Sequence, residues 1–326
     1  MAGNQLRGLP SACFAQCGSL ASLDLSDNQL TEIPPSLWNC LRLTWLNIFS
    51  NCIRKLAPDI GKLVNLRELF AGNNIFTALP KEMASLRQLK ILHLAGNGID
   101  VLDPEILMDS LERLYFSRNE LSEFPNALSA CPRLETIDLS GNKIATASVT
   151  GMFSTLQELV LSHNNLDQFS FVSGSKCSFP NLMVLDLSNN NISSVPDVSD
   201  LKELEILNLL HCNISHLGRK QLDQHAKLSI IYMQGNPVEK ARDLRMSFVE
   251  RKTDLLITDL FKGPGSSLQF GNRLRSSGRE EAEQPHSPPN ILFSWSEIKG
   301  ARTTQEDAMT LRQDLGAENG KESMQL

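Results

Sequence analysis

A short stretch near residue 300 carries the residues with the clearest capacity for chemistry. It follows the pattern S-x-x-x-G-x-R-x-x-x-E-D, with Ser296, Gly300, Arg302, Glu306 and Asp307 at the defined positions. The planar guanidinium of an arginine can bind two phosphate oxygens at once. Carboxylates are ligands that suit hard cations such as Mg²⁺ or Mn²⁺. Residues of these types could bind a phosphate group and a divalent metal ion.

The same stretch resembles the opening motif of the PPM family of metal-dependent protein serine/threonine phosphatases. Residues 291–296 lead into the stretch and end at its first residue, Ser296. Large apolar and smaller side chains alternate among them, as in a strand. The resemblance implies that Arg302 binds the phosphate of a phosphoprotein substrate. It also implies that Glu306 and Asp307 belong to the metal site. We therefore interpret residues 290–326 as the start of a PPM-type phosphatase domain.

That domain is incomplete in this sequence. The next motif of the family, an Asp-Gly-His-Gly run, is absent, and no Asp-Gly dipeptide occurs anywhere in the chain. Two carboxylates are too few to hold a two-metal centre. We expect no catalysis from this chain, and a need for Mg²⁺ or Mn²⁺ only in a protein that completes the domain. The alternative is an accidental acidic pair in a chain that contains 37 acidic residues.

A repeat precedes this stretch and dominates the chain. The pattern L-x-x-L-x-L-x-x-N-x-L occurs ten times between Leu20 and Val238, at a spacing of 22 or 23 residues with two longer intervals of 24 and 26. The polar ladder position of the pattern is occupied by Asn28, Asn51, Asn74, Asn97, Asn119, Asn142, Asn164, Asn190, Cys212 and Asn236. The pattern resembles the leucine-rich-repeat family over about two-thirds of the chain.

The spacing of the leucines predicts the fold. Leucines at the fourth and sixth places make a short strand with one buried face, and no repeat can bury that face without its neighbours. We expect an α/β leucine-rich-repeat solenoid, or horseshoe, with a concave parallel sheet. The ladder asparagines can pair backbone groups that would otherwise be buried without partners. Prolines recur at one phase of the repeat, for example Pro34 and Pro80, and predict irregular convex segments there.

Five sections of the chain are expected from these patterns. Residues 1–19 form a partial repeat or cap, residues 20–238 the ten repeats, residues 239–262 a closing cap, residues 263–289 a flexible linker, and residues 290–326 the phosphatase start. The cap contains an amphipathic stretch and a final short strand near residues 255–260. At the other end, residues 3–6 match the ladder half of a repeat. That end is either an irregular cap or the interior of a longer array.

The strand positions that point away from the core form the candidate binding surface. They are the third, fifth, seventh and eighth places of each repeat. Aromatic and arginine side chains gather there in repeats two to five, which is typical of interface anchors. The predicted partner-binding strip consists of Trp45, Asn47, Phe49, Glu68, Phe70, His93, Arg113, Tyr115, Arg118 and Tyr232.

Composition narrows the function classes. The formal net charge is -6, and no basic stripe or long apolar run indicates a nucleic-acid or membrane partner. Seven scattered cysteines favour reduced thiols, so we expect a cytoplasmic protein, with the nucleus as the alternative. The function predicted first is a protein-binding solenoid that selects substrates for a phosphatase. The alternatives are a plain interaction protein with a disordered tail and a fragment of a fungal-type adenylate cyclase.

Overall fold

The structure is a computed structural model that describes residues 1–106, 109–171, 179–215, 227–237 and 256–258. The chain divides into two units, Met1–Ser267 and Leu268–Leu326. The second unit lies wholly outside the described residues. The predicted linker at 263–289, the predicted phosphatase start at 290–326 and the amphipathic part of the cap lie outside them too.

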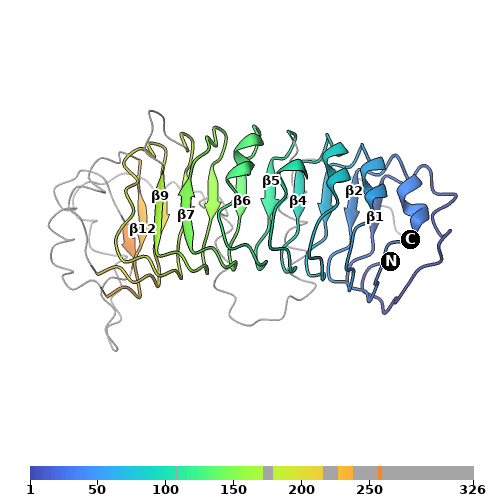
Figure 1. The fold of residues 1–326 in the computed structure, drawn as a ribbon, viewed down its shortest axis with the longest axis horizontal. Coiled ribbons are helices and arrows are strands. Elements are labelled where there is room, and N and C mark those ends of the chain that lie inside the picture. The colour runs from blue at the N-terminus through green and yellow to red at the C-terminus, as the bar shows by residue number, and fades with distance from the viewer. Residues whose placement is uncertain (107–108, 172–178, 216–226, 238–255, 259–326) are drawn as a thin grey trace, which may run out of the picture. The chain divides into compact units, whose positions relative to one another are not determined.

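Short parallel strands, one per repeat, form the main sheet of the first unit. Its eleven strands follow the order β1-β2-β3-β4-β5-β6-β8-β10-β11-β12-β13, and Figure 1 shows strands side by side along the array. Their bounds are Ser22–Asp24 (β1), Trp45–Asn47 (β2), Glu68–Phe70 (β3), Ile91–His93 (β4), Arg113–Tyr115 (β5), Thr136–Asp138 (β6), Glu158–Val160 (β8), Val184–Asp186 (β10), Ile206–Asn208 (β11), Ile230–Tyr232 (β12) and Leu256–Thr258 (β13). The predicted parallel sheet of a repeat solenoid is therefore confirmed.

The register of the sheet is set by the central residue of each strand. Leu23 pairs with Leu46, Leu46 with Leu69 and Leu69 with Leu92, and the same one-to-one pairing continues to β13. From β1 to β12 these central side chains are buried, whereas the first and third residues of most of these strands are only half-buried. Since successive side chains of a strand point to opposite sides, one face of the sheet covers the core and the other faces outward.

Short 3-10 helices and a second small sheet occupy the other side of the repeats. The helices are Pro35–Asn39 (η1), Pro58–Lys62 (η2), Lys81–Ser85 (η3), Pro104–Ile106 (η4) and Asn126–Ala130 (η5). Thr146–Val149 (β7) and Gln168–Phe171 (β9) pair in parallel. The prediction of irregular segments there holds only in part. Pro34 and Pro80 are extended, but each directly precedes a 3-10 helix. Residues 195–198, which include Pro196, form no helix or strand.

A tight turn follows each of the ten predicted strands. The residue before each ladder position has a positive φ, for example 53° at Asp27, 52° at Ser50 and 54° at His163. The side chains of the ladder asparagines join neighbouring repeats by hydrogen bonds. Asn51, for example, accepts a hydrogen bond from the amide of Leu30 and donates to the carbonyl of Leu25, both in the preceding repeat. The predicted pairing of backbone groups by the ladder side chains is thus present.

Residues 1–6 adopt the geometry of the second half of a repeat. Gly3 has a φ of 68°, and its amide donates to the carbonyl of Ser26. The side chain of Asn28 donates to the carbonyl of Met1 and accepts from the amide of Leu6. These are the bonds that a ladder asparagine makes to the repeat before it, so the first strand is joined at its turn to a repeat-like segment.

Candidate partner-binding face

The outward side of the main sheet presents a continuous row of rings. We call Trp45, Phe49, Phe70, His93 and Tyr115 the aromatic strip. Four of these residues lie on the adjacent strands β2 to β5, and Phe49 follows β2 in the turn. The sheet register places Phe70 beside His93 and His93 beside Tyr115. All five side chains are half-buried, so each keeps part of its surface available to a partner.

The rings of the aromatic strip contact one another. The ring centroids of Trp45 and Phe70 are 5.9 Å apart, those of Phe70 and His93 6.1 Å, and those of His93 and Tyr115 5.4 Å. Phe49 meets His93 edge-on at 5.5 Å. Separations of this size are typical of favourable aromatic pairs. The strip is therefore a pre-formed apolar surface, and little side-chain freedom would be lost when a partner binds to it.

Gly72 lies directly beneath two of these rings. A Cβ atom at this position would lie 2.6 Å from Cε2 of Phe49, 2.8 Å from Nδ1 of His93 and 2.8 Å from the carbonyl oxygen of Ala95. No side chain fits there without displacing its neighbours. The glycine thus allows Phe49 and His93 to pack closely over the strand end.

His93 forms the centre of the strip as a neutral ring. Its Nδ1 atom is buried and has no hydrogen-bond partner within the described part of the chain. Burial lowers the pKa of His93 to about 4, because a charged imidazolium is poorly solvated there. At neutral pH the imidazole therefore behaves as one more aromatic ring.

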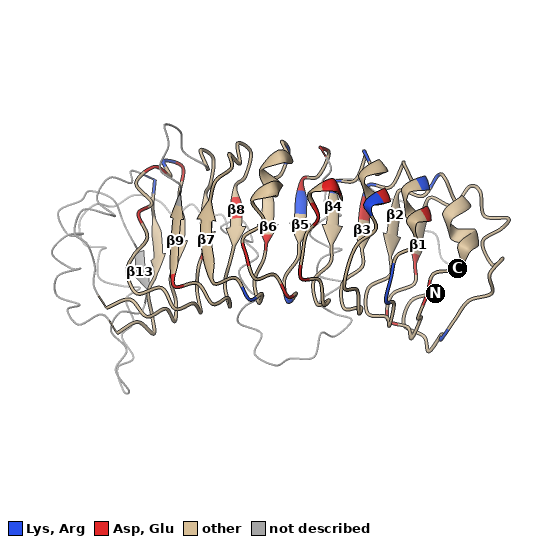
Figure 2. Ribbon diagram, viewed as in Figure 1, with Lys and Arg blue, Asp and Glu red and all other residues tan. Residues whose placement is uncertain are grey.

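Charged side chains border the strip. Burial raises the pKa of Glu68, while Arg113 and a hydrogen bond from Trp45 oppose that shift. Burial also raises the pKa of Tyr115, again opposed by Arg113. Figure 2 shows the basic residue of β5 and the acidic residue of β8 near the middle of the sheet. An arginine beside aromatic rings is a common composition of interface centres.

The predicted strip residues fall into four groups in the structure. The five rings, with Glu68 and Arg113, lie together on β2 to β5 and in the turn after β2. Asn47 is on β2, but its side chain accepts a hydrogen bond from the amide of Phe49 at 3.0 Å. Arg118 lies in the turn after β5 with a φ of 52° and is exposed. Tyr232 is on β12, which the four strands β6, β8, β10 and β11 separate from β5, and so it lies apart from the rings.

Sequence reasoning missed an aliphatic section of the same face. Val184, Ile206 and Ile230 occupy the first, outward position of β10, β11 and β12, and they are aligned by the sheet register. Each is followed by the inward leucine or isoleucine of its strand. The sequence signal for this section is a pair of consecutive apolar residues in a strand, because such a strand has apolar side chains on both faces.

The residues predicted for phosphate and metal binding, Arg302, Glu306 and Asp307, lie outside the described residues. Within the described part of the chain, no group of three or more histidine, cysteine or acidic residues could hold a metal ion. No helix in that part has the length and apolar character needed to cross a membrane.

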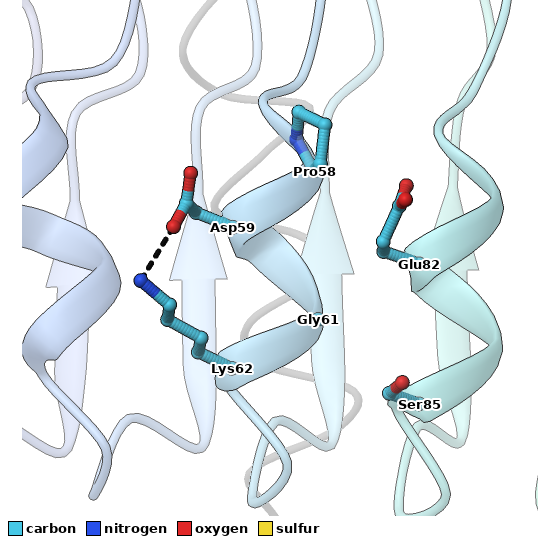
Figure 3. A pocket seen from close by; sticks show the side chains of 6 residues that line it. All are labelled: Pro58, Asp59, Gly61, Lys62, Glu82 and Ser85. Atoms are coloured by element: carbon cyan, nitrogen blue, oxygen red, sulfur yellow. Dashed lines mark ion pairs between the residues drawn. The ribbon is translucent and has the colours of Figure 1, made fainter.

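A shallow surface hollow lies on the helical side of the array, between η2 and η3. Figure 3 shows Asp59 and Lys62 forming an ion pair on one wall, with Glu82 and Ser85 on the other. Gly61 brings the two helices together, since a Cβ atom there would lie 2.7 Å from the carbonyl oxygen of Glu82. The hollow is explained by this close packing, and its ion pair is already satisfied.

Several known proteins are similar to parts of the chain. Podocan-like protein 1 of Mus musculus is 39% identical over 109 residues, covering 32% of the chain and 19% of that protein. PH domain leucine-rich repeat-containing protein phosphatase 1 of Homo sapiens is 32% identical over 109 residues, covering 33% and 6%. Adenylate cyclase of Schizosaccharomyces pombe is 29% identical over 226 residues, covering 68% and 11%. The chain thus spans about a fifth or less of the length of these relatives.

Solved structures share the fold. The chain superimposes on a chain from the octameric complex of Latrophilin 3, Unc5D and FLRT2 with a TM-score of 0.61, at 21% identity and a coverage of 73% and 74%. The plant peptide hormone receptor RGFR1 in complex with RGF2 gives a TM-score of 0.52, at 25% identity and a coverage of 72% and 43%.

A family profile decides the classification. The profile described as Leucine rich repeat matches residues 1–53, 87–144 and 180–238. These matches include more than half of the chain. They contain the strands β1, β2, β4 to β6 and β10 to β12 of the main sheet, together with the turns that follow them. The chain belongs to the leucine-rich-repeat family.

Proposed function

We propose that the outward face of the main sheet binds a protein partner, with the aromatic strip as the centre of the contact. The observation that carries the proposal is the unbroken row of half-buried rings from Trp45 to Tyr115. Buried aromatic side chains at the centre of an interface commonly supply most of its binding energy. The solved receptor RGFR1 in complex with RGF2, a chain of similar fold, supports a ligand-binding role for such an array.

Truncating two rings tests this function. Phe70→Ala and Tyr115→Ala should each weaken binding by about 2 kcal/mol, since each removes an anchor that a partner would bury. Affinity is measured by calorimetry with a purified partner, and folding is checked by circular dichroism. Val101→Ala is the matched control, because Val101 is exposed outside the strands. Unchanged affinity in both ring variants would refute the assignment.

We propose further that the repeat array selects substrates for a metal-dependent protein serine/threonine phosphatase. Two observations favour this activity over that of a plain interaction protein. The stretch from Ser296 to Asp307 matches a phosphatase opening motif in sequence. One relative of the array is by name a protein phosphatase with leucine-rich repeats. Arg302 would bind the substrate phosphate, and Glu306 and Asp307 would contribute to a Mg²⁺ or Mn²⁺ site.

The test of the phosphatase proposal uses the full-length gene product that contains this sequence. Hydrolysis of a phosphoserine peptide should require Mn²⁺ or Mg²⁺, and Asp307→Ala should abolish it by weakening the metal site. Arg302→Ala should mainly raise KM while Mn²⁺ affinity persists. Activity that is indifferent to Asp307→Ala would contradict the proposal. A stop codon directly after residue 326 would favour the plain interaction protein, and a downstream cyclase domain would favour the adenylate cyclase alternative suggested by the relative from Schizosaccharomyces pombe.

A further inference from the structure

The outward face of the sheet carries more acidic than basic side chains. Among the described strands β1 to β6, β8 and β10 to β12, the outward positions hold one basic residue, Arg113. The same positions hold five acidic residues, namely Asp24, Glu68, Asp138, Glu158 and Asp186. A partner that covers this face must therefore be compatible with an excess of negative charge.

Three of these carboxylates are fixed by their own strand ends. Asp24, Asp138 and Asp186 each accept a hydrogen bond from the amide two residues further on, at 3.0, 2.9 and 2.9 Å. Their primary role is local, because these bonds hold the backbone where the strand turns. Their carboxylates nevertheless place negative charge on the outward face, at the third position of each of these strands. Burial raises the pKa of Asp138 and Asp186.

Glu158 differs from these aspartates. It lies on β8, between β6 with Asp138 and β10 with Asp186. Its carboxylate makes no ion pair and no side-chain hydrogen bond with another described residue. Burial raises its pKa, Asp138 and Asp186 raise it further, and Arg113 opposes them. A half-buried carboxylate flanked by two others is destabilised in its charged form, so an approaching cation would be favourable there.

The acidic section adjoins the aromatic strip. Tyr115 is on β5 and Glu158 on β8, with β6 between them. The register aligns Glu158 with Arg113, two residues before Tyr115. Two strand spacings of about 4.8 Å and two residues of about 3.3 Å therefore place the two side chains about 12 Å apart at their roots. An extended segment would bridge that distance with about three to four residues.

We propose that the partner presents a basic linear segment, in which an aromatic or large aliphatic side chain packs on the aromatic strip and a lysine or arginine about three to four residues away pairs with Glu158. This inference rests on the proposed binding function and specifies the chemistry of the partner. The aromatic strip supplies the apolar anchor, and the surplus of carboxylates selects the sign of the charge. An acidic segment or a nucleic acid would meet repulsion on the same face.

A selection from a random peptide library displayed on phage tests the inference. Peptides that bind the immobilised chain should be enriched in lysine and arginine close to an aromatic or large aliphatic residue. A selected peptide is then synthesised with a fluorescent label and titrated against the chain by anisotropy. Glu158→Gln should weaken its binding about tenfold, and replacing its basic residue with glutamate should have at least as large an effect.

A matched control separates this specificity from a general attraction to an acidic protein. Glu105→Gln removes the same charge from η4, on the other side of the repeats, and should change affinity less than twofold. An equal loss in Glu105→Gln and Glu158→Gln, peptides without basic enrichment, or a failure to recover any peptide would overturn the inference. Loss of binding in Tyr115→Ala without loss in Glu158→Gln would overturn the basic specificity and leave the proposed function standing. Unchanged binding in both would contradict both.

Discussion

Replacing Asn74 with alanine is expected to lower the free energy of unfolding by about 3 kcal/mol. The Nδ2 atom of Asn74 donates to the carbonyls of Ile48, Ala71 and Gly72, at 2.9, 3.2 and 3.1 Å. Its Oδ1 atom accepts from the amide of Ile53 at 3.0 Å. Alanine would remove all four bonds and leave the buried amide of Ile53 without a partner. The three carbonyls would each keep one other donor, namely Asn51 for Ile48, Asn97 for Ala71 and the amide of Ser50 for Gly72. An unpaired buried polar group costs about 1–3 kcal/mol.

Urea unfolding followed by circular dichroism measures this loss as a lower midpoint. Asn191→Ala is the control, because it makes the same change at an exposed position outside the ladder, and it should move the stability by less than about 0.5 kcal/mol. Since repeat arrays can lose cooperativity, the two variants are compared at matched protein and urea concentrations. An Asn74→Ala midpoint equal to that of the control would mean that the ladder does not hold the repeats together.

Position 212 shows how much of the ladder a different side chain can supply. The Cys212 thiol donates to the carbonyls of Leu187 and Leu210, with sulfur–oxygen distances of 3.3 and 3.7 Å. Burial raises its pKa to about 11, so it remains a neutral donor. The thiol thus keeps the donor role of the ladder side chain, although it is a weaker donor and acceptor than an amide.

The strands and the ladder could be predicted from sequence because each depends on local spacing. In β3 and the residue after it, Leu69 and Ala71 flank Phe70. This period of two assigns Leu69 and Ala71 to the core and Phe70 to the outward face. Asn74 follows at a fixed distance, so its role repeats with the pattern. The other side of each repeat has no such period. Short 3-10 helices and the β7–β9 pair are both compatible with its sequence, and packing between repeats decides between them.

The candidate site was harder to predict because contiguity depends on register along the whole array. Tyr115 and Tyr232 occupy equivalent positions in their repeats, yet only Tyr115 joins the row of rings, since the residue in register with Tyr232 on the adjacent strand β11 is Asn208. The interaction of Glu158 with its two acidic neighbours likewise requires knowledge of which strands are adjacent. A sequence pattern identifies the outward positions, and the structure shows which of them form one surface.

The packing beneath that surface leads to a second large effect, at Gly72. Gly72→Ala should lower the free energy of unfolding by about 3 kcal/mol, in the range of overpacking substitutions in well-packed interiors. The added methyl group would overlap the rings of Phe49 and His93. Those rings could move, but the carbonyl oxygen of Ala95, 2.8 Å away, belongs to the next strand end and can move only if the sheet shifts. Partner affinity should fall too, because the aromatic strip would lose its packing.

Gly98→Ala is the matched control for this prediction. A Cβ atom at Gly98 would have its nearest neighbour at 3.5 Å, an ordinary contact, so this variant should unfold and bind like the parent chain. Near-ultraviolet circular dichroism, which reports on the packing of aromatic rings, should change in Gly72→Ala and remain the same in Gly98→Ala. Adding Phe49→Ala to Gly72→Ala should recover part of the stability by removing one of the overlaps, but not the affinity, because an anchor ring is then missing. If Gly72→Ala keeps the parent stability and affinity, the rings of the strip do not need the close approach that this glycine allows, and the strip is not a pre-formed surface.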